Sequence, residues 1–132
     1  MLCHGYSAST YEWLEIKKLL ETESKSKASL ILLGGHGRNI EIFKKTSWEE
    51  WLAPIILEYK TLKKQGYTNI SLGCASTSAS LVLIALSKGE LQDIQNLIFI
   101  DPFIKSTNRY FNIIPYIGFL GHLPEYKGRT LL

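Results

Sequence analysis

Short apolar runs that alternate with longer amphipathic stretches are the feature that most constrains the fold of this chain. The runs at residues 30–33, 70–72 and 97–100 are apolar and closed by turn residues, which is typical of strands that helices cover on both faces. Residues 1–3 form a shorter run of the same kind. The alternation predicts the order βαβαβαβ, an α/β fold with a parallel sheet of about four strands, right-handed crossovers and flanking helices.

Helix signals fill the segments between these runs. Ser9 with Glu12, and Ser47 with Glu50, have the spacing of capping boxes ahead of apolar residues at helical spacing. Pro54 falls inside the second helical stretch, and it predicts either a kink or a second helix start there. The third stretch, at residues 77–87, is apolar almost all round, so we expect it to be buried.

The 132 residues correspond to one domain, and a composition of 45% hydrophobic and 20% charged residues is that of a globular protein. From Asp101 onward, prolines, glycines and aromatic residues follow one another without a clear period. We therefore divide the chain into a core portion at 1–102 and a different region at 103–132. Loops and short helices over one end of the sheet are expected in that region.

Charge, hydropathy and cysteine content exclude several classes of function. A net charge of +3, scattered along the chain, is too weak a signal for nucleic-acid binding. No stretch approaches the ~20 apolar residues of a membrane span, and no signal-peptide pattern is present, so we expect a cytoplasmic protein. Cys3 and Cys74 lack the C-x-x-C spacing, which favours buried thiols in a reducing compartment. The three histidines lack ligand spacing, so no metal site is expected. No P-loop lysine and no G-x-G-x-x-G pattern follows a strand, so no cofactor is expected.

Catalytic groups in open parallel sheets lie at the carboxyl ends of the strands, where strands turn into helices. Residues 73–78 are six small residues between a strand and a buried helix, as a sharp turn requires when its central side chain is exposed. Ser76 is the preferred centre, because it leaves the helix from Leu81 onward in register; the other register centres the turn on Ala75. Backbone N–H groups of Thr77 and Tyr6 are candidate donors to a developing oxyanion.

Five segments together resemble the middle of an α/β-hydrolase, of the esterase, monoacylglycerol-lipase and serine-aminopeptidase-like branch. "LCHGYSASTYEW" resembles the oxyanion strand and loop of that branch, "GGHG" its next loop and "SWEEWL" its following helix start. "CASTSASLVL" resembles the nucleophile elbow, and "LIFIDPF" the next strand. That strand leads into residues 103–132, which the resemblance makes the start of a lid or cap region. The resemblance implies a partial α/β-hydrolase fold, Ser76 as nucleophile, an oxyanion hole from Tyr6 and Thr77, and a small-molecule or lipid ester as substrate.

The sequence departs from that branch at the elbow and in the partners of the serine. Cys74 and Ser78 occupy the two glycine positions of the G-x-S-x-G pattern. The triad order in this fold is Ser, then Asp or Glu, then His. His122 is the candidate base, with a surface or packing role as the alternative, and Asp101 is the candidate acid, with a local Asp-Pro turn as the alternative.

His4 and His36 precede Ser76 and resemble the structural turn histidines of the family, so we expect structural roles in which their rings are satisfied by hydrogen bonds. The chain is about half as long as the ~200 to 250 residues of large single α/β domains. We therefore expect a truncated or degenerate hydrolase with an incomplete triad.

Three functions remain open on the sequence alone. The first is acyl transfer to water from a carboxylic ester through an acyl-enzyme on Ser76. The second is a non-catalytic, degenerate hydrolase that binds or scaffolds, and it needs no further histidine. The third is a flavodoxin-like binder of a flavin or nucleotide phosphate, held by Ser76, Thr77 and Ser78 at a helix N-terminus. Exposed sheet edges would in each case favour self-association.

Overall fold

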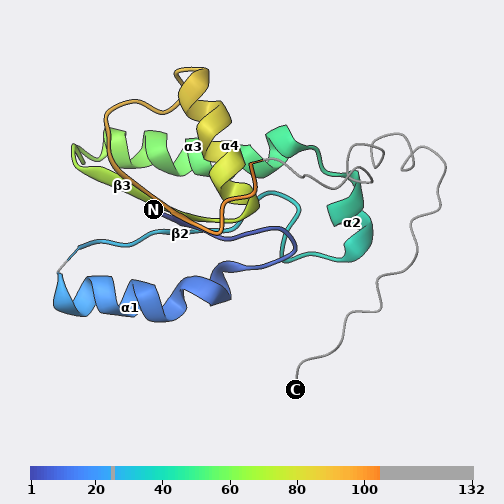
Figure 1. Cartoon of the computed structure of the whole chain (residues 1–132), viewed down its shortest axis with the longest axis horizontal. Coiled ribbons are helices and arrows are strands. Elements are labelled where there is room, and N and C mark those ends of the chain that lie inside the picture. Colours follow the sequence, from blue (N-terminus) through green and yellow to red (C-terminus); the bar gives the residue numbers. More distant parts are fainter. Residues whose placement is uncertain (25, 105–132) are drawn as a thin grey trace.

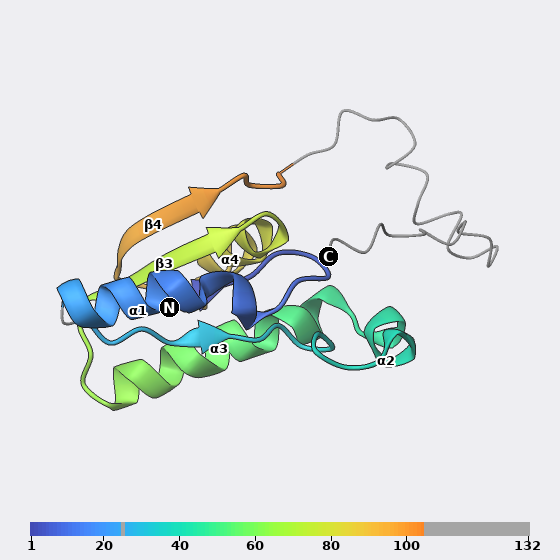
Figure 2. The same cartoon turned by 90° about the horizontal axis from the view of Figure 1, so that it is seen from below.

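The structure is a computed structural model that describes residues 1–24 and 26–104. Four strands form one sheet in the order β2-β1-β3-β4 (Figures 1 and 2). They are β1 (Leu2–Cys3), β2 (Leu30–Ile31), β3 (Ile70–Ala75) and β4 (Ile94–Ile100), and all neighbouring pairs are parallel. The predicted four-stranded parallel sheet is thus confirmed, including the short strand at the start of the chain.

Helices cover the two faces of the sheet unequally. A 3-10 turn η1 (Thr10–Trp13) and helix α1 (Leu14–Glu23) lie on one face, and α3 (Trp48–Lys64) and α4 (Thr77–Ser87) lie on the other (Figures 1 and 2). The chain moves from β1 outward to β2 and then back past β1 to β3 and β4. Because crossovers are right-handed, this reversal places the helices of the two directions on opposite faces. A short helix α2 (Ile40–Lys45) precedes α3.

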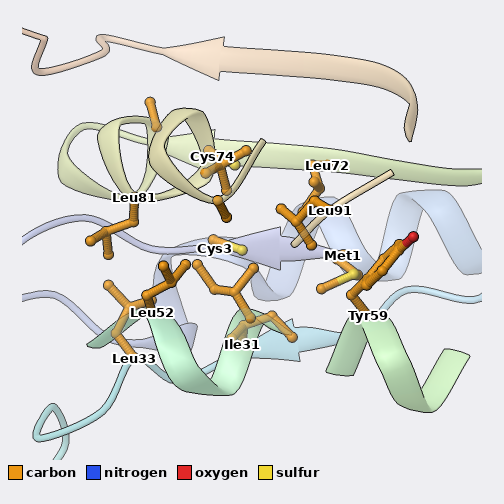
Figure 3. Packing of buried hydrophobic residues seen from close by; sticks show 14 of the residues in the cluster. Met1, Cys3, Ile31, Leu33, Leu52, Tyr59, Leu72, Cys74, Leu81 and Leu91 are labelled. Carbon is orange, nitrogen blue, oxygen red and sulfur yellow. The ribbon is translucent and has the colours of Figure 1, made fainter. Parts of the chain in front are cut away.

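The main core lies between the sheet and the α3–α4 layer. Leu72, Cys3 and Cys74 project from the strands toward Leu52 of α3 and Leu81 of α4 (Figure 3). Cys3 and Cys74 are directly paired across β1 and β3, fully buried and free, as expected for small core thiols. A second, smaller cluster on the opposite face contains Leu2, Trp13 and Ala28.

The helix signals were confirmed in different degrees. Ser47 and Glu50 form a full capping box at the start of α3, whereas Ser9 caps η1 by accepting only from the Tyr11 N–H. The bounds of α4 agree with the prediction, but burial does not extend all round, since Leu83 and Ile84 are half-buried.

The prediction of a second helix start at Pro54 is wrong, because α3 continues through Pro54 to Lys64. Proline has no N–H, so the Glu50 carbonyl one turn earlier lacks its usual helical donor. The backbone at Gly34 packs directly against this carbonyl, and any side chain at position 34 would collide with it. The loop after β2 can thus lie against the first turn of α3 only because residue 34 has no side chain.

None of the helices within residues 1–24 and 26–104 is long and apolar enough to span a bilayer. Residues 105–132, most of the predicted region at 103–132, lie outside the described residues, and His122 is among them.

Candidate active site

Ser76 occupies the junction between β3 and α4 in a backbone conformation that only a constrained residue adopts. Its φ of 50° and ψ of −115° lie outside the regions that L-residues favour, and holding a residue there costs about 1 to 3 kcal/mol. The Ser76 N–H donates to the Ile100 carbonyl oxygen at 2.9 Å, and the Ser76 carbonyl accepts from Ala79 at 3.1 Å. β4 and α4 together hold the turn, which leaves the side chain half-buried at the carboxyl edge of the sheet.

The loop after β1 packs directly onto this turn. A Cβ placed on Gly5 would lie 3.2 Å from the Ser76 Cβ and 3.4 Å from the Ala75 carbonyl oxygen. Both distances are tighter than, or at the limit of, ordinary van der Waals contact. Glycine at position 5 therefore allows the His4–Gly5–Tyr6 backbone to approach the serine, which is the arrangement expected of an oxyanion loop.

The His4 side chain holds the loop after β1 in place through two hydrogen bonds. The ring is fully buried; Nδ1 donates to the Gly5 carbonyl oxygen at 2.8 Å and Nε2 accepts from the Leu33 N–H at 3.0 Å. These two bonds require the neutral Nδ1-protonated tautomer. Burial, reinforced by the neighbouring His36, lowers the pKa of His4 although its bond to Gly5 opposes that shift. The expected structural role of His4 is confirmed.

The backbone N–H groups of the two candidate oxyanion donors, Tyr6 and Thr77, are not used by the fold of the described residues. Within the described part of the chain, neither the Tyr6 nor the Thr77 N–H donates a hydrogen bond. Thr77 is the first residue of α4, where the helix dipole adds partial positive charge. Tyr6 follows Gly5, whose backbone touches the serine.

The residues that replace the two elbow glycines are fully buried and structurally engaged. The Ser78 hydroxyl, with one proton to donate, shares it between the Cys3 and Ala75 carbonyl oxygens, both at 2.9 Å, and so links the ends of β1 and β3 beneath the elbow. Cys74 lies in the core opposite Cys3. A small side chain is accommodated at each position, and the positive φ falls on Ser76.

Asp101 directly follows β4. The residue before it is Ile100, whose carbonyl oxygen accepts the hydrogen bond from the Ser76 N–H. It also has a positive φ, 45°, and is exposed. Its carboxylate has no hydrogen bond or ion pair among residues 1–24 and 26–104. The topology therefore brings Asp101 to the same edge as Ser76, without the local N–H bonds of an Asp-Pro turn.

No base contacts the serine in the described residues. The Ser76 hydroxyl has no hydrogen-bond partner there, and both ring nitrogens of His4 are already used. His36 donates from Nδ1 to the Gly34 carbonyl oxygen at 3.0 Å, and its Nε2 is buried without a partner in that part of the chain. Full hydrogen-bond satisfaction, expected for His36, is wrong for this atom.

Sequence reasoning missed an aromatic cluster at this edge of the sheet, formed by Tyr6, His36, Phe43 and Trp51. Phe43 and Trp51 are stacked, with centroids 5.5 Å apart and planes at 8°, and the His36 ring meets Phe43 edge-on at 4.8 Å. Tyr6 packs on Phe43 at 5.3 Å and remains 57% exposed. The four rings form one aromatic surface next to Gly5. They come from four separate segments, namely the loops after β1 and β2 and the helices α2 and α3.

The candidate nucleophile, its two potential oxyanion donors and the candidate acid thus gather at one edge of the sheet. Among the described residues, no group of three or more histidine, cysteine or acidic side chains could hold a metal ion. The sequence matches none of the known protein families with which it was compared, and no curated protein is a detectable relative.

Proposed function

We propose that this protein is a serine hydrolase of the α/β-hydrolase type that acts on carboxylic esters through an acyl-enzyme on Ser76. The observation that carries the proposal is the conformation of Ser76, which has positive φ at a strand-to-helix turn packed against Gly5. Strain of this size persists only where the surroundings impose it, and it concentrates at functional positions. A nucleophile elbow supplies a direct reason for it.

The chemistry would run in two steps. Ser76 Oγ attacks the ester carbonyl carbon, its proton passes to a base and then to the departing alcohol, and an acyl-enzyme remains. Water then attacks the acyl group, and the carboxylic acid leaves with the hydroxyl of Ser76 restored. In each step the N–H groups of Tyr6 and Thr77 would stabilise the oxyanion, helped by the dipole of α4.

The base has to come from outside residues 1–24 and 26–104, because no described group contacts the Ser76 hydroxyl. His122 is the candidate in this chain, and Asp101 at the adjoining strand end is the candidate acid. The substrate class, a small or lipid ester, follows from the resemblance, and the exposed Tyr6 of the aromatic cluster offers apolar contact to it. Two free thiols in the core fit a reducing compartment such as the cytoplasm.

A second candidate is the non-catalytic relative that uses the same fold for binding. The observation that favours it is the missing base: Ser76 has no activating partner in the described residues. The phosphate-binding alternative has less support, because the Ser78 hydroxyl is fully buried and bonded to two carbonyl oxygens. That hydroxyl cannot face a phosphate at the start of α4.

Hydrolysis of short-chain p-nitrophenyl esters separates the enzyme from the non-catalytic protein. We expect turnover by the full chain, its loss in Ser76→Ala, and its retention in Ser87→Ala, which removes an exposed hydroxyl at the far end of the same helix. Absence of turnover by the folded wild type, or equal turnover by Ser76→Ala, would contradict the proposal. Far-UV circular dichroism of each variant shows that the fold is intact.

A further inference from the structure

Two rings of the aromatic cluster hold the Tyr6 side chain from one side. Phe43 meets it at 5.3 Å with the ring planes at 65°, and Trp51 at 5.8 Å with the planes at 59°. Trp51 is itself fixed, because its indole N–H donates to the Thr46 hydroxyl at 2.9 Å and its ring stacks on Phe43. Tyr6 is nonetheless 57% exposed, so these contacts orient its ring and leave much of it accessible to a ligand.

The aromatic cluster lies on one defined side of Ser76. The sheet order β2-β1-β3-β4 places β3, which ends beside Ser76, between β1 and β4. Tyr6 and His36 follow β1 and β2, whereas Asp101 follows β4. Figure 2 shows α2, which contributes Phe43 to the cluster, and β4 at opposite sides of the sheet. The serine therefore lies between the aromatic cluster and the candidate acid.

The two parts of an ester would extend to different sides of this serine. The departing alcohol takes its proton from the base, and the acid of the triad orients that base. Because Asp101 follows β4, we expect the alcohol part on the β4 side. The acyl part then extends toward β1 and β2. Tyr6 lies on that side, next to Gly5, whose backbone packs on Ser76.

We propose that the acyl group of the substrate carries an aromatic ring, which packs against Tyr6. This inference rests on the proposed ester hydrolysis and names the substrate class of the same site. Aromatic rings gain from edge-to-face and offset contacts beyond the apolar area that they bury, and Tyr6 already makes contacts of this kind with Phe43 and Trp51. A saturated ring of the same size lacks this gain. We therefore expect kcat/KM to favour a phenyl over a cyclohexyl acyl group by about threefold to tenfold.

Matched pairs of p-nitrophenyl esters vary the acyl group while the alcohol stays constant. The pairs are phenylacetate with cyclohexylacetate, and phenylpropionate with cyclohexylpropionate. We expect the full chain to prefer the phenyl member of at least one pair. Tyr6→Leu keeps the backbone N–H and an apolar side chain but should abolish this preference, whereas Tyr6→Phe should retain it. Each preference is a ratio within one protein, so a general change in the activity of Ser76 cancels.

The matched control is Tyr67→Leu, the same substitution at the opposite edge of the sheet. Tyr67 is exposed and lies just before β3, at the amino ends of the strands. This variant should therefore keep the phenyl preference of the wild type. Circular dichroism of each variant shows that the fold is intact.

The same two rings on the alcohol side test the assignment to the acyl group. Benzyl acetate and cyclohexylmethyl acetate should show no preference that depends on Tyr6. Three results would overturn the proposal: no phenyl preference in either acyl pair, a preference that Tyr6→Leu leaves unchanged, or a Tyr6-dependent preference on the alcohol side alone.

A binding measurement separates failure of this inference from failure of the proposed function. Saturation-transfer NMR of phenylacetamide with the Ser76→Ala protein should show contact with the phenyl protons, weakened about threefold or more when Tyr6→Leu is added. Ester hydrolysis without phenyl preference would overturn the inference and leave the proposed function intact. Tyr6-dependent binding of phenylacetamide without ester hydrolysis by the wild type would contradict the proposed function and support the aromatic contact. Absence of both hydrolysis and binding would contradict both.

Discussion

Replacement of Ser76 by glycine should stabilise the fold while it removes the nucleophile. The positive φ at Ser76 costs about 1 to 3 kcal/mol for any residue with a Cβ. Glycine adopts this conformation without strain. It loses more conformational entropy on folding than other residues, which reduces the gain in stability by about 0.5 to 1 kcal/mol. The Ser76 hydroxyl has no hydrogen bond among the described residues, so its loss should change little. We expect Ser76→Gly to be more stable than Ser76→Ala by about 1 kcal/mol.

Urea unfolding followed by circular dichroism measures this difference directly. The alanine variant is the correct reference, because it also lacks the hydroxyl but keeps the Cβ and the strain. Ser80 in the same helix supplies the control pair, since an ordinary helical position should show the opposite order, with Ser80→Gly less stable than Ser80→Ala by about 1 kcal/mol. A Ser76→Gly variant less stable than Ser76→Ala would refute the claim that the elbow stores strain.

Three further predictions follow from neighbouring contacts. Gly5→Ala should lower ester turnover by about tenfold with the fold intact, because a Cβ 3.2 Å from the Ser76 Cβ displaces the loop that carries the Tyr6 N–H; unchanged turnover would contradict this role for Gly5. The pKa of His4 in the folded protein lies below its unfolded value near 6.5, so the unfolded chain binds more protons at this residue. The free energy of unfolding in urea should therefore fall as the pH drops below about 6.5, by at most about 1.4 kcal/mol per pH unit. His4→Asn should lose this pH dependence, and an unchanged pH slope in that variant would argue against the assignment to His4. Cys3 and Cys74 should react with Ellman's reagent only after unfolding in urea, because both thiols are buried. In addition, a hydrogen bond with Cys74 and burial raise the pKa of Cys3, which disfavours its reactive thiolate. A thiol that reacts quickly in the native protein would contradict the placement of both cysteines in the core.

The sequence predicted the order of strands and helices because each has a strong local signal. The apolar runs are short and closed by turn residues, and the Ser47–Glu50 capping box is complete within four residues. Pro54 shows where local reasoning fails. From the sequence, Pro54 predicted either a kink or a second helix start, and α3 continues through it; the close packing of Gly34, twenty residues earlier in the chain, against the Glu50 carbonyl is a long-range contact that no local pattern contains.

The candidate site was predictable where one segment contains its geometry. Six small residues ahead of an apolar helix pointed to a sharp turn at Ser76, and the turn has positive φ at that residue. The aromatic cluster was not predictable, because Tyr6 and His36 in the loops after β1 and β2 meet Phe43 of α2 and Trp51 of α3 only in the folded protein.

Intact-mass analysis after treatment with a fluorophosphonate tests most directly whether Ser76 is an activated nucleophile. In this reaction the serine oxygen bonds to phosphorus and fluoride leaves, so the mass increases only where a serine is activated. We predict one adduct on the full chain, no adduct on Ser76→Ala, and one adduct on Ser87→Ala. A folded wild-type protein without an adduct, or an adduct that persists in Ser76→Ala, would contradict the account of Ser76 as the nucleophile.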